Sequence, residues 1–213
     1  MHERSESFGY ESTLDTEPDE HCTSRNKIES VLSLSALELE LLQVLKNTTD
    51  TQRMSKTKRV LESYIGSDWN VYVKDPKLNS ECQSGYERVP VASHTGVFDL
   101  LVLSWGPGAK SPIHNHPCER CFLMALTDSM QEMRYAKTKK GDLQLIEVLP
   151  IPKGVATWIS DDIGLHSVKN VGDAISYSLH CYVPGFTQPC TIYDPFTGIS
   201  SFVSLPAYPS KTT

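Results

Sequence analysis

The sequence feature that most constrains the fold is a change in hydrophobic spacing after Trp69. From there onward, short segments rich in β-branched and aromatic residues alternate with Gly, Pro, Asp and Asn. This pattern is typical of strands joined by turns, and it predicts an all-β barrel or jelly roll. Between Ala136 and Leu143, TKKGD predicts a hairpin turn in which Gly141 takes a positive φ. The expected strands are FDLLVLSW, CFLMAL, MQEMRY, LQLIEVL, VATWIS, LHSVKNV, ISYSLHCYV and FVSLPAY.

Two helices are expected before the strands. From Ile28 to Leu45, apolar residues recur at mostly helical spacing, and Arg59 to Ile65 offers a second, shorter helix. Together they predict a small helical segment over about residues 28–65. The barrel is then expected over about residues 69–208, within a single domain that spans residues 27–213.

Charge and composition limit the possible partners. The net charge is -6, and residues 1–30 hold eight acidic against three basic residues, so the remainder is nearly neutral. Residues 1–26 are polar and acidic, which predicts a disordered tail. A neutral barrel without a basic stripe favours a small-molecule ligand over nucleic acid or a membrane. No signal-peptide core or membrane-spanning run is evident, so we expect a monomer in the reducing cytoplasm.

Four potential metal ligands stand close together in SPIHNHPCERCFL, which begins at residue 111. They are His114, His116, Cys118 and Cys121, and their chemistry first suggests structural zinc. Residues two apart in a strand face the same side, so the two histidines are expected to face the barrel interior together. Such a pair also occurs without a metal. A third ligand must come from elsewhere, and His166 is the best candidate, at the start of another strand.

The spacing around these histidines resembles the two halves of the cupin metal motif. Cupins usually place a glutamate ligand after HxH, whereas here Glu119 lies too near and Cys121 takes the expected place. With WGPGxxSPIHxHxxxxCFL, IGLHxVxN and SLHxY, the chain resembles the thiol dioxygenases, and in particular the cysteine dioxygenase (type I) family. The resemblance covers about Tyr86 to Gly198. It implies a cupin double-stranded β-helix, a jelly-roll barrel.

The resemblance implies a mononuclear Fe(II) centre held by His114, His116 and His166, with O2 as co-substrate. Three neutral imidazoles leave the charge of Fe(II) intact and several positions open, so that a thiolate substrate can supply the missing anion. Zinc lacks the redox chemistry needed to activate O2, which favours iron. The implied reaction oxidises free L-cysteine to cysteine sulfinic acid, the first step of cysteine catabolism toward taurine and sulfate.

Several further residues match substrate-binding positions of the family. Tyr86 and Arg88 resemble its YxR motif, whose arginine binds the cysteine carboxylate through two parallel hydrogen bonds. The alternative is a solvated surface arginine. Trp105 resembles a tryptophan in the wall of the active site, and Cys190 matches a pocket-mouth cysteine after a one-residue shift. Leu205 stands near a family methionine and is expected to form an apolar pocket wall.

Ser178, His180 and Tyr182 alternate in YSLHCY, which predicts that they share one face of a strand. In the family, the serine and histidine orient the tyrosine hydroxyl, and a thioether joins the tyrosine to a cysteine that Cys121 matches. Without the neighbouring motifs, a core histidine held by a serine would be an equally good interpretation. If the thioether forms, Cys118 becomes an incidental, exposed loop thiol rather than half of a redox or zinc CxxC pair.

Three alternatives stay open at this level. A related thiol dioxygenase would act on 3-mercaptopropionate or cysteamine, although cysteamine has no carboxylate for Arg88 to bind. The barrel could instead be a non-catalytic cupin that binds metal structurally or binds a small molecule. The acidic tail could carry a regulatory or partner-binding role, with the barrel as its carrier.

Overall fold

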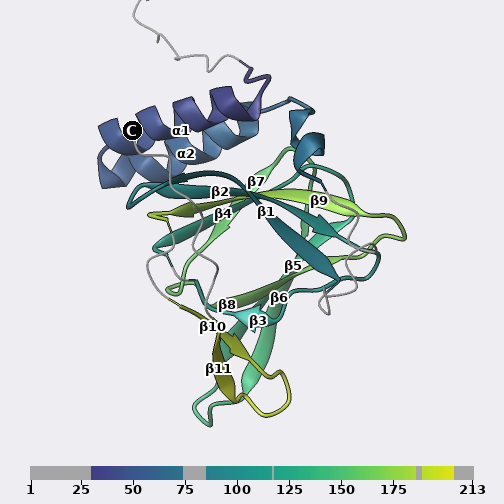
Figure 1. The fold of residues 1–213 in the computed structure, drawn as a ribbon. Coiled ribbons are helices and arrows are strands. Elements are labelled where there is room, and N and C mark those ends of the chain that lie inside the picture. Colours follow the sequence, from purple (N-terminus) through teal and green to yellow (C-terminus); the bar gives the residue numbers. More distant parts are fainter. Residues whose placement is uncertain (1–29, 74–84, 117, 186–188, 204–213) are drawn as a thin grey trace, which may run out of the picture.

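The computed structural model describes residues 30–73, 85–116, 118–185 and 189–203, and in these ranges the chain forms two antiparallel sheets below a pair of helices (Figure 1). The five-stranded sheet runs in the order β1 (Tyr86–His94), β2 (Phe98–Trp105), β9 (Ser176–Val183), β4 (Arg120–Ala125), β7 (Ala156–Ile159). The six-stranded sheet runs in the order β11 (Ser200–Val203), β10 (Cys190–Tyr193), β3 (Ile113–His114), β8 (Leu165–Asn170), β5 (Met130–Lys137), β6 (Leu143–Ile151). The predicted mainly-β fold with preceding helices is confirmed.

Short apolar segments bounded by turn residues located most strands correctly. β2 coincides with FDLLVLSW, and β4 to β9 each lie within two residues of their predicted segments. In the predicted hairpin turn, Gly141 has φ of 94° and the Thr138 amide donates to the carbonyl of Asp142 at 2.9 Å. The expected strands did not include β1 or β10, and the strand expected to carry both His114 and His116 is only the two-residue β3. Of FVSLPAY, the first two residues end β11 and the rest lies outside the described residues.

Helix α1 (Leu34–Asn47) begins six residues later than expected from the apolar spacing. Two side-chain oxygens fix its start, because Ser33 accepts from the Ala36 amide at 3.1 Å and Asp68 accepts from the Leu34 amide at 2.8 Å. Before the helix, Val31 pairs with Tyr64 in an isolated parallel bridge. The prediction of helix from Ile28 is therefore wrong over the described residues before Leu34.

Helix α2 (Asp50–Ser63) begins well before the expected start at Arg59. Its first nine residues, DTQRMSKTK, contain Met54 as their one strongly apolar residue, so hydrophobic spacing gave no signal there. The 3-10 helix η1 (Asp68–Tyr72) follows at the place where strands were expected to begin. The described barrel strands therefore begin at Tyr86, which corrects the expected start near residue 69.

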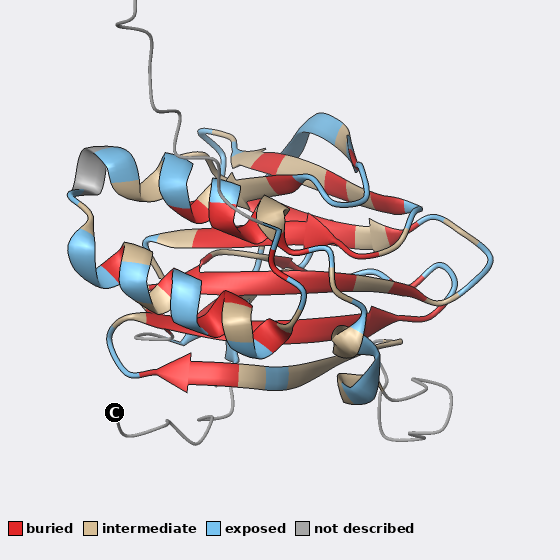
Figure 2. Ribbon diagram, turned by 90° about the horizontal axis from the view of Figure 1, so that it is seen from above, coloured by how far each residue is buried: buried red, intermediate tan, exposed pale blue. Residues whose placement is uncertain are grey.

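The helices cover the outer face of the five-stranded sheet, and Figure 2 shows their exposed outer faces above buried strands. Alternate residues of β2 enter two different cores, since Leu100 packs with the helices and Leu101 packs inside the barrel. Burial of each such large apolar side chain contributes about 1.5–3 kcal/mol to folding. The same alternation directs Tyr182 of β9 to the barrel interior. Neither described helix is long and apolar enough to cross a membrane.

Candidate metal centre

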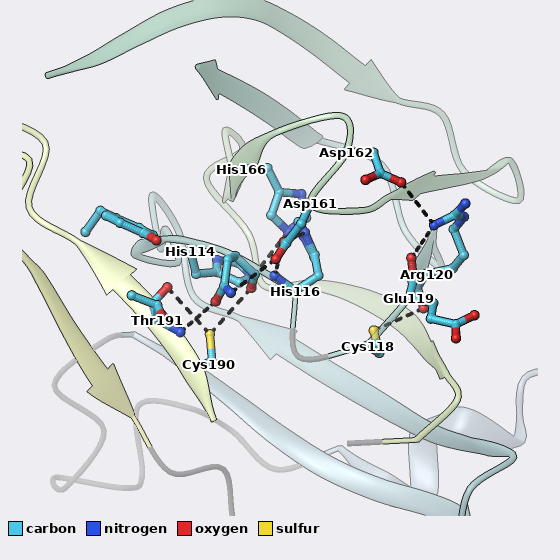
Figure 3. A network of polar contacts seen from close by, with 12 residues as sticks. His114, His116, Cys118, Glu119, Arg120, Asp161, Asp162, His166, Cys190 and Thr191 are labelled. Carbon is cyan, nitrogen blue, oxygen red and sulfur yellow. Dashed lines mark hydrogen bonds and ion pairs between the residues drawn. The ribbon is translucent and has the colours of Figure 1, made fainter. Parts of the chain in front are cut away.

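Three histidines converge on one point inside the barrel (Figure 3). His114 and His166 are direct partners across β3 and β8, and their Nε2 atoms lie 3.2 Å apart. The His116 ring centroid lies 4.6 Å from that of His166. One ligand atom from each histidine lies within 4.8 Å of the other two. The structure therefore brings together the three residues that the sequence singled out as metal ligands.

The route by which His116 reaches this point differs from the prediction. The strand β3 ends at His114, so the pair does not project from one continuous strand. Beyond the strand, the His116 amide donates to Asp161 at 2.8 Å. Between the two histidines, Asn115 Oδ1 accepts from the Thr191 amide at 2.7 Å, and its Nδ2 donates to Asp161 at 3.3 Å. A turn held by Asp161 and Thr191, rather than strand alternation, aims His116 inward.

Gly164 allows the strand that carries the third histidine to begin close to its neighbour. Gly164, two residues before His166, has φ of 137°, which side-chain-bearing residues rarely adopt. A Cβ atom there would lie 2.7 Å from the carbonyl oxygen of Tyr135 on β5. Glycine therefore allows β8 to begin close against β5, which sets His166 in register beside Arg134.

Each of the three imidazoles has its Nδ1 atom bound to an acceptor. His114 donates to the carbonyl of Pro112 at 2.9 Å, and the other two histidines donate to carboxylates, Asp161 at 3.3 Å and Glu132 at 2.8 Å. With the proton held on Nδ1, each Nε2 atom presents a lone pair. The Nε2 atom of His116 is buried and has no hydrogen-bond partner among the described residues. Such a group is costly unless something binds it, and a metal ion fits this set of donors.

Burial keeps two of the three imidazoles, those of His114 and His166, in the form that binds metals. Burial, followed by the neighbouring histidines, holds the pKa of His114 well below its usual value of 6.5. Burial and His116 do the same to the pKa of His166. Neutral imidazole is the ligand form, because a protonated ring nitrogen has no lone pair to give. At neutral pH these two histidines are therefore ready to bind a cation.

Two carboxylates of this site were missed in the sequence. Glu132 of β5 is only 1% exposed and accepts from Arg134 at 3.2 and 3.0 Å. Burial raises the pKa of Glu132, and the charge of Arg134 opposes that rise. A signal existed for Glu132, because alternation in MQEMRY puts it on the same face as Met130, which is buried in the barrel. Asp161 lies in a turn, where no periodic pattern marks it.

Cys121 and Tyr182 face each other directly across β4 and β9. Opposite residues of an antiparallel pair have Cβ atoms about 4.5–5.5 Å apart, so their side chains are neighbours. Both side chains are buried, and they are joined by a hydrogen bond. Burial raises the pKa of the Cys121 thiol well above its usual value, although the hydrogen bond from Tyr182 acts in the opposite direction. The pair that the sequence predicted to be crosslinked is thus in register.

A row of polar side chains leads along β9 to that tyrosine. Trp105 Nε1 donates to Ser178 Oγ at 2.9 Å, which leaves the hydroxyl proton free to bind His180 Nε2 at 3.0 Å. The rings of His180 and Tyr182 are stacked, with centroids 6.2 Å apart. Burial, followed by the charge of Arg88, lowers the pKa of His180 to about 3. His180 is therefore a neutral hydrogen-bonding residue.

Arg88 lies beside the ring of Tyr86. It is half-buried on β1, donates to the Tyr86 hydroxyl at 3.4 Å, and lies 5.5 Å from the centroid of that ring. The Tyr86 ring in turn stacks on Trp105, with centroids 4.6 Å apart. The charge of Arg88 lowers the pKa of His180, and it also lowers that of His114, a residue of the histidine cluster. Arg88 is therefore half-buried, and its charge is close enough to lower the pKa values of two interior histidines.

The remaining cysteines differ in their surroundings. Cys190 is buried on β10, and its thiol donates to the Asn115 carbonyl at 3.6 Å. The expected exposure of Cys118 is wrong, because it is half-buried against the barrel core and donates to the Arg120 carbonyl at 3.1 Å. Burial raises the pKa of Cys118 to about 12, and Figure 3 shows it apart from the histidines. Leu205 lies outside the described residues.

A β-barrel in which three histidines converge, each bound to an acceptor through its Nδ1 atom, fits a protein with a non-haem metal site. Residues 24–195 match the family described as cysteine dioxygenase type I. The chain belongs to that family and is a dioxygenase enzyme.

Its curated relatives carry the same name. Cysteine dioxygenase type 1 of Homo sapiens is 29% identical over 161 residues, which cover 73% of this chain and 77% of the relative. The Bos taurus protein is 32% identical over 150 residues, covering 68% and 72%. The Rattus norvegicus protein is 31% identical over 161 residues, covering 73% and 77%.

Proposed function

We propose that this protein oxidises the thiol of free L-cysteine to cysteine sulfinic acid at an Fe(II) centre held by His114, His116 and His166. The observation that carries the proposal is the convergence of three Nε2 lone pairs in a chain of this family. Iron, when bound, supplies the redox chemistry that activates O2, which zinc does not offer. Both oxygen atoms enter the product and the thiol supplies the electrons, so no external reductant is needed.

The protein's own contribution begins with charge. Three imidazoles bring no negative charge to the metal, and the site's carboxylates, Glu132 and Asp161, bind to imidazole Nδ1 atoms instead. An anionic sulfur of the substrate is therefore the natural anion to complete the site. A carboxylate ligand would reduce both the attraction for the thiolate and the number of open positions. This arrangement supports a thiol substrate.

Arg88 is proposed to bind the substrate carboxylate. Its guanidinium is held at the Tyr86 ring, and Tyr86 is itself stacked on Trp105, so the charged group is oriented before substrate arrives. A planar guanidinium donates two parallel hydrogen bonds to a carboxylate. Cys190, and Leu205 outside the described residues, are proposed as further pocket residues. This end of the site favours cysteine or 3-mercaptopropionate over cysteamine.

Tyr182 is proposed to position the reacting end of the substrate through its hydroxyl, with Ser178 and His180 fixing its ring. We also propose a thioether between Cys121 and Tyr182, which their register and hydrogen bond support. Its formation removes one hydrogen from the thiol and one from the ring, and O2 is the electron acceptor. We further propose that the protein is a monomer located in the cytoplasm. There it would catalyse the first step of cysteine catabolism toward taurine and sulfate.

A comparison of three thiols tests the substrate assignment. The Fe(II)-loaded protein is assayed with L-cysteine, 3-mercaptopropionate and cysteamine, and kcat/KM is expected to be highest for L-cysteine and lowest for cysteamine. Highest activity on cysteamine would contradict the role of Arg88. Zinc at full occupancy in the isolated protein, together with no oxygen uptake after iron loading, would support a non-catalytic cupin instead.

A further inference from the structure

A buried carboxylate lies behind one of the three histidines. Glu132 is 1% exposed, and its Oε1 atom accepts from His166 Nδ1 at 2.8 Å. Burying a carboxylate is costly unless it is paired and hydrogen-bonded. Because this burial is costly, both oxygens of Glu132 are expected to have hydrogen-bond partners.

The second oxygen is bound by an arginine. Arg134 donates to Glu132 Oε2 through Nε at 3.2 Å and through Nη2 at 3.0 Å. Each carboxylate oxygen therefore has its own partner, with His166 on one and the guanidinium on the other. Arg134 follows Glu132 by two residues on β5 and is the direct partner of His166 across β5 and β8. The three side chains are thus fixed by the register of two strands.

The outer end of the arginine reaches toward the surface. Its Nη1 atom lies 3.5 Å from a carboxylate oxygen of Glu147, which is opposite Arg134 on β6 and 48% exposed. By contrast, His116 is bound by Asp161, which is 54% exposed and 3.3 Å away. Of the two carboxylate-bound imidazoles, that of His166 has the shorter and more deeply buried acceptor.

We propose that Glu132 and Arg134 form a clamp that orients His166 and thereby sets the affinity of the site for its metal. Arg134 holds the Glu132 carboxylate in place, and Glu132 keeps the His166 proton on Nδ1, so that the Nε2 lone pair faces the metal. Both are positioning residues, since neither contacts the metal. The inference rests on the proposed function only in taking the three histidines as ligands. Loss of such an outer partner typically weakens metal binding about 10- to 100-fold.

The test measures dissociation constants for Co(II) alone, by competition with a chelator, in the parent protein and in E132Q, R134M and the double variant. His166 and Arg134 donate to different oxygens of Glu132, and glutamine would put an NH2 donor in one of those two positions, so E132Q is expected to bind metal roughly 10- to 100-fold more weakly. R134M is expected to bind Co(II) at least about threefold more weakly than the parent. Because Arg134 acts through Glu132, the double variant should bind no more weakly than E132Q. The matched control is E147Q, which touches only the outer end of Arg134 and should stay within twofold.

Parent-like affinity in both E132Q and R134M would overturn the clamp. The clamp would also be refuted if the losses of metal affinity in the two single variants multiplied in the double variant, because Arg134 would then act independently of Glu132. The visible spectrum of bound Co(II) should shift in E132Q and R134M, which a general loss of stability would not produce. If E132Q does not fold, R134M and R134K decide, with R134M binding metal more weakly than the parent and R134K lying between them. Unchanged affinity in R134M would then refute the inference.

A separate variant distinguishes this inference from the proposed function. H166A should abolish tight metal binding if the three histidines are ligands. If H166A binds metal like the parent, the proposed metal site itself is wrong. If H166A loses the metal while E132Q and R134M keep it, the metal site stands and only the clamp fails.

Discussion

The buried imidazole of His180 predicts a specific loss of stability in acid. In the folded protein its pKa is about 3, because burial and then the charge of Arg88 disfavour the protonated ring. In the unfolded chain the same group has its usual pKa of about 6.5. Protonation therefore favours unfolding. The stability contribution is complete above pH 6.5 and is lost as the pH falls from there toward 3.

The magnitude follows from the difference between the two pKa values. Below pH 6.5, each pH unit costs about 1.4 kcal/mol until the folded-state pKa is reached. At pH 5 the expected loss from this one group is roughly 2 kcal/mol relative to neutral pH, as an order-of-magnitude figure. Glutamine in place of His180 cannot titrate, so H180Q should lack this part of the acid sensitivity, even if it is less stable at neutral pH.

The assay is urea unfolding of metal-free parent and H180Q at pH 7 and pH 5. Metal-free protein is used because a bound metal would itself be released in acid. The free energy of unfolding should fall about 2 kcal/mol more in the parent than in H180Q between these values. Equal pH dependence in the two proteins would refute the assignment of His180 as a buried neutral imidazole. A larger fall in H180Q would reverse the sign of the argument.

Three further predictions concern binding, covalent structure and the helical segment. R88M removes charge-assisted hydrogen bonds to the substrate carboxylate, so KM for L-cysteine should rise roughly 10- to 100-fold while KM for cysteamine stays constant; equal changes for both thiols would contradict carboxylate binding. Intact mass should be about 2 Da lower than the sequence mass where Cys121 and Tyr182 are crosslinked, and C121S should lose this deficit, whereas its persistence would place the crosslink elsewhere. D68A removes the acceptor for the Leu34 amide and the Tyr64 hydroxyl, so it should cost about 1–2 kcal/mol in urea unfolding, with exposed D173A as the control; equal stability of the two variants would refute the capping role.

The sequence predicted those strands that stand out as short apolar segments between turn residues. β2 was located to the residue because both of its faces are buried, one against the helices and one inside the barrel. The start of α2 was missed because its first turns are polar. A strand was expected to carry both His114 and His116, but β3 has only two residues and ends at His114. Helix α1 begins where Ser33 and Asp68 accept its first amides, and a contact with Asp68 across 34 residues cannot be read from local spacing.

The residues of the candidate site also divide into those that the sequence predicted and those that it did not. The histidines and the pairing of Cys121 with Tyr182 came from motifs, and the fold places each of them in the barrel interior. The carboxylates that bind the histidines, Asp161 and Glu132, did not come from motifs. Asp161 acts from a turn, and the partners of Glu132 depend on strand register. Cys118 shows the opposite error: polar neighbours suggested exposure, but the chain packs its thiol against the core.

The central claim is that this chain delivers both atoms of O2 to the sulfur of free cysteine at a three-histidine iron site. The most direct measurement loads the protein with Fe(II) without oxygen, then adds L-cysteine and isotopically labelled O2, and follows oxygen uptake and product mass. One O2 should be consumed per cysteine, without added reductant, and the cysteine sulfinic acid formed should carry two labelled atoms. Cystine with no label, or no uptake by fully iron-loaded protein, would contradict it.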